Sequence, residues 1–168
     1  MILVRAIVWS SLFIAAVLVL LPARLLSGTG VTRPPALGAG QVAGIALVLG
    51  GSVLALWCIG SFVVLGRGTP APFDPPLRLV VRGPYRFVRN PMYLGAGLAL
   101  LGLAIFYGSA AVLAYGLALA VGMHLLVLLY EEPTLREKFG DEYRAYCARV
   151  HRWLPSAGSP ARAGNDRS

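Results

Sequence analysis

One charge-free stretch of this chain, between Pro91 and Glu131, constrains its fold more than any other feature. Residues 91–130 contain no Asp, Glu, Lys or Arg, and polar character returns abruptly at Glu131 and Glu132. A helix needs about 20 apolar residues to cross a bilayer. These 40 residues therefore predict two crossings joined by a turn. Two crossings return the chain to the same membrane face, which brings the two polar ends of the stretch together.

The composition agrees with a membrane protein built around one helical bundle. Of 168 residues, 57% are hydrophobic and only 13% are charged, whereas soluble domains carry about 25% charged residues. The net charge of +8 comes from basic residues at the edges of apolar runs, where positive-inside anchoring and anionic headgroups account for them. Nucleic-acid binding is therefore not expected. Cys58 and Cys147 lack the spacing of a disulfide framework or a metal site, so we expect reduced cysteines and no bound metal.

Three apolar regions predict an all-α integral membrane protein with about four transmembrane helices. Residues 2–21 form a first span, with a signal peptide as the alternative, and residues 42–65 form a second. Residues 91–130 form a helical hairpin whose turn we place at Tyr107-Gly108-Ser109. After the hairpin, apolar residues recur at spacings of three or four and predict an amphipathic cytosolic tail, broken at Gly140-Asp141.

The distribution of Lys and Arg predicts the orientation. In a four-span topology, 13 of the 15 lie on the side of the N-terminus, the loop at 67–90 and the C-terminal tail, while Arg24 and Arg33 lie on the other side. The positive-inside rule makes both termini cytoplasmic. The expected location is a bacterial inner membrane, with the polar ends of the hairpin facing the cytosol.

Small residues in the spans predict close helix packing. Gly50-Gly51 lies in the middle of its span, and Gly95, Ala99 and Gly102 share one face of the next helix. We expect the second set to pack against the fourth span. Gly97 lies off that face, where a flat ligand group can approach the backbone.

The arginines before the hairpin indicate an anion-binding helix N-terminus. Asn90 is the natural N-cap and Pro91 suits the first helical turn. This leaves Tyr85, Arg89 and Tyr93 without a structural explanation. An arginine at the positive end of a helix dipole favours a carboxylate or phosphate, although membrane anchoring accounts for one or two of these arginines.

Three ionisable residues lie toward the other end of the hairpin. Glu131 and Glu132 are either a solvated acidic pair or a pair in which one carboxylate binds a cation or ribose hydroxyls. Adjacent helical residues point about 100° apart, so one can face the bundle and the other the interface. His124 is expected two turns before Glu131 on the same face. It is either functional or hydrogen-bonded to a neighbouring helix.

Together these segments resemble the isoprenylcysteine carboxyl methyltransferase family of integral-membrane enzymes and the related phospholipid N-methyltransferases. The resemblance rests on GPYRFVRNPMYLGAG, the apolar hairpin and EEPTLREKFGDEYRAYCARVHRWLP. It implies S-adenosylmethionine as cofactor and methyl transfer, at the cytosolic face, to a lipophilic acceptor that enters from the bilayer. The acceptor is an isoprenylcysteine-type carboxylate or a lipid-like small molecule. Three units follow: N-terminal spans and loop (1–79), methyltransferase core (80–155) and disordered tail (156–168).

The resemblance and the residues singled out above define the expected site. The expected cofactor-binding residues are Tyr85, Arg89, Asn90, Pro91, Tyr93, Gly95, Gly97, His124, Glu131, Glu132 and Tyr143. Arg89 and Arg144 are the expected catalytic residues, which would hold an acceptor carboxylate. The family usually has His where this chain has Asn90, and an amide cannot titrate near neutral pH. The alternatives are an NADPH-dependent membrane reductase and a non-enzymatic membrane scaffold.

Overall fold

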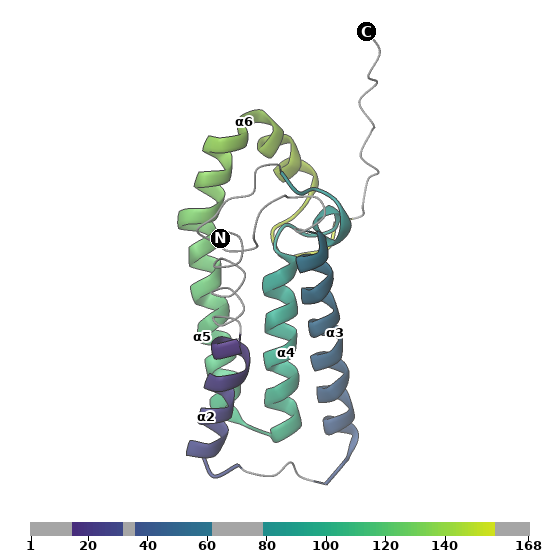
Figure 1. The fold of residues 1–168 in the computed structure, drawn as a ribbon, viewed down its shortest axis with the longest axis vertical. Coiled ribbons are helices and arrows are strands. Elements are labelled where there is room, and N and C mark those ends of the chain that lie inside the picture. The colour runs from purple at the N-terminus through teal and green to yellow at the C-terminus, as the bar shows by residue number, and fades with distance from the viewer. Residues whose placement is uncertain (1–14, 32–35, 62–78, 157–168) are drawn as a thin grey trace, which may run out of the picture.

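The computed structural model describes residues 15–31, 36–61 and 79–156. Within these ranges the chain is helical and contains no strand, which confirms the all-α prediction. Figure 1 shows α3, α4 and α5 side by side along the long axis, with α6 bent over one end. The elements in chain order are η1 (Ala16–Leu20), α2 (Leu21–Gly28), α3 (Ala39–Ser61), η3 (Gly83–Arg86), α4 (Pro91–Tyr107), α5 (Ala110–Leu126), η4 (Val127–Glu131) and α6 (Glu132–Arg149). Predictions for residues 1–14, 62–78 and 157–168 lie outside the described residues.

Two of the described helices are long and apolar enough to cross a membrane. They are α3 and the continuous helix Ala110–Arg149, whose apolar part ends at Tyr130. The apolar helices Ala16–Gly28 and α4 are shorter. Large side chains on the spans, such as Val53 and Val121, are at least 60% exposed. Water disfavours such a surface and hydrocarbon does not, so the described chain has the surface of a membrane protein.

The turn of the predicted hairpin is confirmed. Helix α4 ends at Tyr107, and Gly108 follows in the left-handed conformation with φ of 61°, which glycine adopts without steric cost. Ser109 then precedes α5, and its hydroxyl accepts a hydrogen bond from the Val112 N–H. This stop and N-cap reverse the chain, so the start of α4 and the end of α5 lie at the same end of the bundle.

Helix α4 packs on α3 through glycines, at backbone distance. A Cβ on Gly51 would lie 2.4 Å from the carbonyl oxygen of Gly95, and a Cβ on Gly102 would lie 2.6 Å from that of Gly44. The prediction that this face of α4 packs against the fourth span is therefore wrong. The partner is α3. Its contact glycines, Gly44 and Gly51, are spaced seven residues apart, as are Gly95 and Gly102 on the antiparallel α4, and the pairs coincide.

The helix from α5 to α6 is continuous but irregular at two points. The π-helical turn η4 separates α5 from α6. Inside α6, Gly140 has φ of 49° and ψ of −121°, which confirms the predicted break. A π turn holds more residues than an α turn. The α-helical spacing that placed His124 and Glu131 on one face therefore does not hold across η4.

Candidate functional site

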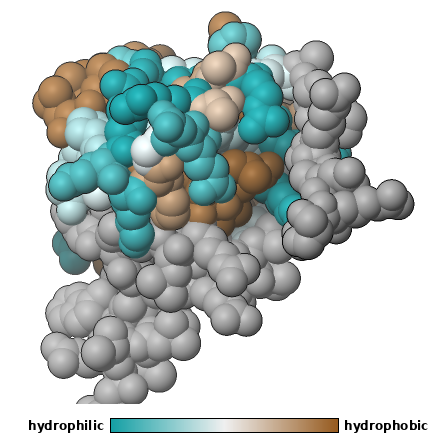
Figure 2. Space-filling view, turned by 90° about the horizontal axis from the view of Figure 1, so that it is seen from above, coloured by the Kyte–Doolittle hydropathy of each residue, from teal (hydrophilic) through white to brown (hydrophobic). Residues whose placement is uncertain are grey.

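Polar side chains from four segments meet at one end of the bundle. The segments are the loop before α4, the first turn of α4, the junction of η4 with α6, and residues 150–156 after α6, which we call the C-terminal strap. Seen from this end, hydrophilic side chains are gathered over the described part of the molecule, with apolar ones between them (Figure 2). The folding of two apolar helices back on each other produces this meeting, as the sequence predicted.

Tyr93 and Glu131 join the two arms of the hairpin. The Tyr93 hydroxyl, in the first turn of α4, donates a hydrogen bond to Oε1 of Glu131 in η4. Burial of Glu131 raises the pKa of its carboxyl group, as does the neighbouring Glu132 charge, while the Tyr93 hydrogen bond acts in the opposite direction. Glu131 is therefore an acceptor in a poorly hydrated position that a further hydrogen-bond donor would stabilise.

Glu132 is the centre of a largely buried ion cluster. Its carboxylate accepts two hydrogen bonds from Arg152, at 2.7 and 3.0 Å from Nε and Nη2. Arg89 Nη1 lies 3.0 Å from Oε1, and Arg136 Nη2 lies 3.6 Å from Oε2. Burial alone would raise the pKa of Glu132, but the Arg152 hydrogen bond and the three guanidinium charges outweigh it and hold the pKa below its usual value. Glu132 is therefore ionised and fully engaged.

Arg89 retains an unused donor inside this cluster. Its side chain is 12% exposed, and Nη1 also contacts the Cys147 sulfur at 2.8 Å. Among the described residues, the Arg89 Nε is the one buried side-chain nitrogen or oxygen without a hydrogen-bond partner. Buried donors are normally satisfied, and three arginines surround the one carboxylate of Glu132. The site therefore favours an additional anion, such as a carboxylate, near Arg89.

The C-terminal strap closes one side of the site. The Arg89 N–H donates to the His151 carbonyl at 2.9 Å, and the Asn90 side-chain amide donates to the Arg152 carbonyl at 3.3 Å. Asn90 precedes α4 as predicted, but its side chain makes no cap hydrogen bond. The reason is that the amide is used to hold the strap. Pro91 is fully buried at the first helical position.

The remaining residues predicted for the site lie in different surroundings. Tyr85 is buried beside Cys58, and its carbonyl accepts the Tyr146 hydroxyl at 2.6 Å. Tyr143 is buried in the apolar cluster under α6 and shares a hydrogen bond with Cys147. It therefore reaches the site through the thiol that Arg89 contacts.

His124 and Arg144 have partners away from the two glutamates. His124 Nδ1 accepts a hydrogen bond from the Trp153 indole at 3.0 Å. The Arg144 side chain is 74% exposed and pairs with Asp141 at 3.0 Å. The sequence left open a hydrogen bond from His124 to a neighbouring helix, but its partner lies in the C-terminal strap. The contact of Arg144 is local to α6.

The two glycines at the start of α4 differ in their surroundings. Gly95 faces α3, where a Cβ would lie 2.7 Å from the Gly51 carbonyl oxygen. Gly97 is exposed, and nothing lies within 4 Å of the position of its Cβ. Gly95 is thus required for packing, while Gly97 leaves backbone open to approach beside the site.

Arg152, Cys147 and Trp153 contact site residues and were not singled out from the sequence. Cys58 and Cys147 are free thiols, as predicted. Among the described residues no cluster of His, Cys, Asp or Glu could hold a metal ion. The strap is not helical, so no periodicity in its sequence predicts which of its side chains point toward the site. The run of basic and aromatic residues His151, Arg152 and Trp153 is the one available signal.

One comparison with known proteins identifies a family. The family model for phospholipid methyltransferases matches residues 39–142. The match includes α3, the hairpin, Arg89 and both glutamates, and it ends before the strap. No curated protein and no solved structure gave a match. The matched region is more than half of the chain, and the chain therefore belongs to the phospholipid methyltransferase family.

Proposed function

We propose that this protein transfers a methyl group from S-adenosylmethionine to a lipophilic acceptor at the cytosolic face of the membrane. Family membership supports a methyltransferase that acts on a lipophilic substrate. The observation that carries the cofactor proposal is the position of Arg89, whose Nε lacks an acceptor, beside two different carboxylates. Glu132 is paired with arginines, whereas Glu131 is hydrogen-bonded to Tyr93. S-adenosylmethionine has a carboxylate, an ammonium group and ribose hydroxyls, and these are the chemical partners that such a set selects.

The proposed cofactor contacts follow from the donors and acceptors of the site. The guanidinium of Arg89 takes the cofactor carboxylate, and Glu131, held by Tyr93, accepts hydrogen bonds from the ammonium or ribose hydroxyls. Gly97 gives the nucleoside room beside the backbone. The other residues of the predicted cofactor site shape it or close it: Tyr85, Asn90, Pro91, Gly95, His124, Glu132 and Tyr143.

The bound cofactor supplies an electrophilic methyl group on a sulfonium. For transfer of that methyl group the protein would contribute binding, orientation and exclusion of water. The sequence predicts Arg89 and Arg144 as contacts for an acidic acceptor group. Because Arg89 is largely buried and Arg144 is exposed, Arg89 fits the cofactor end and Arg144 fits an acceptor at the surface.

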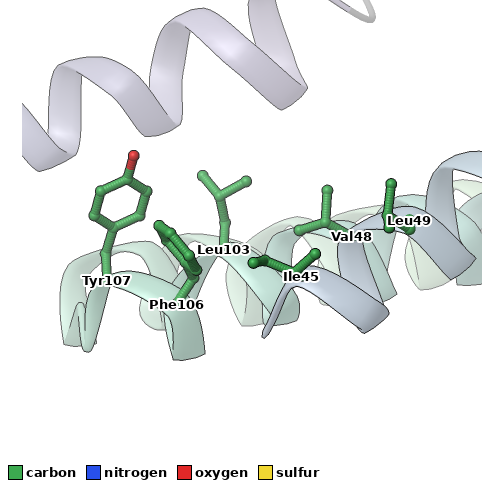
Figure 3. A pocket seen from close by; sticks show the side chains of 6 residues that line it. All are labelled: Ile45, Val48, Leu49, Leu103, Phe106 and Tyr107. Carbon is green, nitrogen blue, oxygen red and sulfur yellow. The ribbon is translucent and has the colours of Figure 1, made fainter. Parts of the chain in front are cut away.

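An apolar groove supports a lipophilic acceptor. It has a volume of about 240 Å³ and lies between α3 and α4, lined by Ile45, Val48, Leu49, Leu103, Phe106 and Tyr107 (Figure 3). These residues lie toward the start of α3 and the end of α4, away from the polar end. An acceptor with its hydrocarbon chain in this groove and its head group near Arg89 would extend from one end of the bundle to the other. Both an isoprenylcysteine-type carboxylate and a phospholipid-like amine satisfy this description.

The proposed topology has four spans, with both termini cytoplasmic in a bacterial inner membrane. It rests on the two long apolar helices, the two shorter ones and the excess of basic residues at the polar end. In this topology the unit 80–155 carries the methyltransferase site and the unit 1–79 completes the bundle.

Transfer of a labelled methyl group tests the proposed activity. Membranes containing the protein are incubated with methyl-labelled S-adenosylmethionine, and label is counted in the chloroform-extractable fraction. We expect labelled lipid with the native protein and with Glu137→Gln, since Glu137 is an exposed carboxylate on α6. Label should fall to the level of empty membranes with Glu131→Gln. Equal labelling by native protein and Glu131→Gln would contradict the proposal.

A further inference from the structure

The C-terminal strap sends one charged side chain into the site. The strap backbone is held near both ends, by the hydrogen bond from the Arg89 N–H to His151 and by the 2.7 Å hydrogen bond from the Ser156 N–H to the Phe87 carbonyl. The Asn90 amide also donates to the Arg152 carbonyl. Between them, Arg152 directs its guanidinium to Glu132. None of these strap residues lies in the region that the family model matches.

Arg152 determines how Glu132 is oriented. A planar guanidinium that donates to both oxygens of a carboxylate fixes its plane as well as its position. Arg152 makes this two-point contact with two hydrogen bonds, whereas Arg89 approaches Glu132 as an ion pair, with Nη1 at 3.0 Å from Oε1. Arg136 is more distant, at 3.6 Å, and its side chain is 61% exposed. Arg152 is therefore the dominant partner, and Arg89 takes the contact that remains.

This division leaves Arg89 with a free donor, its Nε. With Arg152 in place, Glu132 lies against Nη1 of Arg89, and Nε stays without an acceptor. Without Arg152, the carboxylate would be free to rotate and to move its contact from Nη1 to the Nε side of the Arg89 guanidinium. A guanidinium paired in that way has no donor left in the position where the site favours an anion.

We propose that Arg152 is a positioning residue, which fixes Glu132 and thereby keeps the guanidinium of Arg89 directed at the anionic end of the cofactor. The proposal rests on the proposed function, because it assigns a role within that site. It also separates the two glutamates. Glu131 contacts the cofactor, and Glu132 acts through Arg89.

Titration with S-adenosylmethionine tests the role of Arg152. The native protein and three variants are compared in lipid nanodiscs by calorimetry: Arg152→Ala, Arg152→Lys and Arg149→Ala. We expect Arg152→Ala to raise Kd by about tenfold to a hundredfold, the usual cost of misplacing a contact group. Lysine cannot make the two-point contact, so Arg152→Lys should recover only part of the affinity. Arg149→Ala removes the same charge from the exposed end of α6 and should match the native protein.

A double-variant cycle separates positioning from a general effect on folding. If Arg152 acts through Glu132, then adding Arg152→Ala to Glu132→Gln should change Kd by less than about twofold, within the usual additivity error. An equal loss in both backgrounds would overturn the proposal, as would native affinity in Arg152→Ala. Failure of the native protein to bind S-adenosylmethionine would instead refute the proposed function. Circular dichroism of each variant establishes that the helices are retained.

Discussion

The contact between α3 and α4 leads to a sharp contrast between two neighbouring glycines. A Cβ on Gly51 would lie 2.4 Å from the Gly95 carbonyl oxygen and 2.8 Å from the Ala99 nitrogen. Both obstacles are backbone atoms, which cannot rotate away. A Cβ on Gly50, one residue earlier in the same helix, would have nothing within 4 Å. Substitution by alanine should therefore separate the two positions cleanly.

The geometry sets the size of the expected effect. Ordinary contact begins at 3.4 Å, so Gly51→Ala requires the helices to separate by up to about 1 Å, and overpacking of this kind costs about 1–3 kcal/mol. Gly50→Ala leaves the packing intact and gains up to about 1 kcal/mol from helix propensity. The displaced α4 carries Tyr93 in its first turn, and an error of 1 Å can reduce a catalytic rate by about a hundredfold.

Unfolding in detergent and methyl transfer measure the two consequences. We expect Gly51→Ala to lower the unfolding midpoint and the transfer rate, and Gly50→Ala to leave the midpoint unchanged or raised, with native transfer. Equal midpoints for the two variants would refute the close approach of α3 and α4.

Further substitutions test the site and the hairpin. The pKa of Glu132 is lowered in the folded state. Its contribution to the free energy of unfolding is therefore present above its unfolded pKa and is lost as pH falls through its folded pKa. Glu132→Gln should reduce stability at neutral pH and flatten the acid limb of a stability–pH curve. The pKa of Glu131 is raised in the folded state, so its effect on stability has the opposite pH dependence. The stability that protonated Glu131 contributes is lost as pH rises through its folded pKa. Glu131→Gln should therefore raise the thermal unfolding midpoint at neutral pH. Tyr146→Phe leaves the buried Tyr85 carbonyl without its 2.6 Å donor and should cost about 1–3 kcal/mol in denaturant titration. Ser109→Ala removes the N-cap of α5 and should cost about 1 kcal/mol in the same measurement.

Features that depend on spacing along one helix were predictable from the sequence. The apolar length of the hairpin, its glycine turn at Gly108 and the break at Gly140 follow from residue types at fixed positions. The return of the chain also explains why Arg89 meets Glu132 and Tyr93 meets Glu131. These four residues stand at the two ends of one apolar stretch of predictable length.

Features that depend on a choice between partners were not predictable. The glycines of α4 fit either neighbouring helix by composition, and the actual partner, α3, is fixed by the matching positions of Gly44 and Gly51. The π turn η4 changes the direction in which the residues after it point relative to His124, and no distinctive residue pattern in the sequence marks this turn. Arg152 lies in an irregular segment, where no period predicts the direction of its side chain.

Binding of S-adenosylmethionine to the purified protein in lipid nanodiscs tests the central claim most directly. Calorimetric titration of the native protein should give saturable binding, and the same titration of Glu131→Ala should give none. The reason is that Glu131, oriented by the Tyr93 hydroxyl, is the proposed acceptor for the cofactor. NADPH should give no heat of binding to either. Absence of S-adenosylmethionine binding to the native protein, or saturable binding of NADPH in its place, would contradict the account.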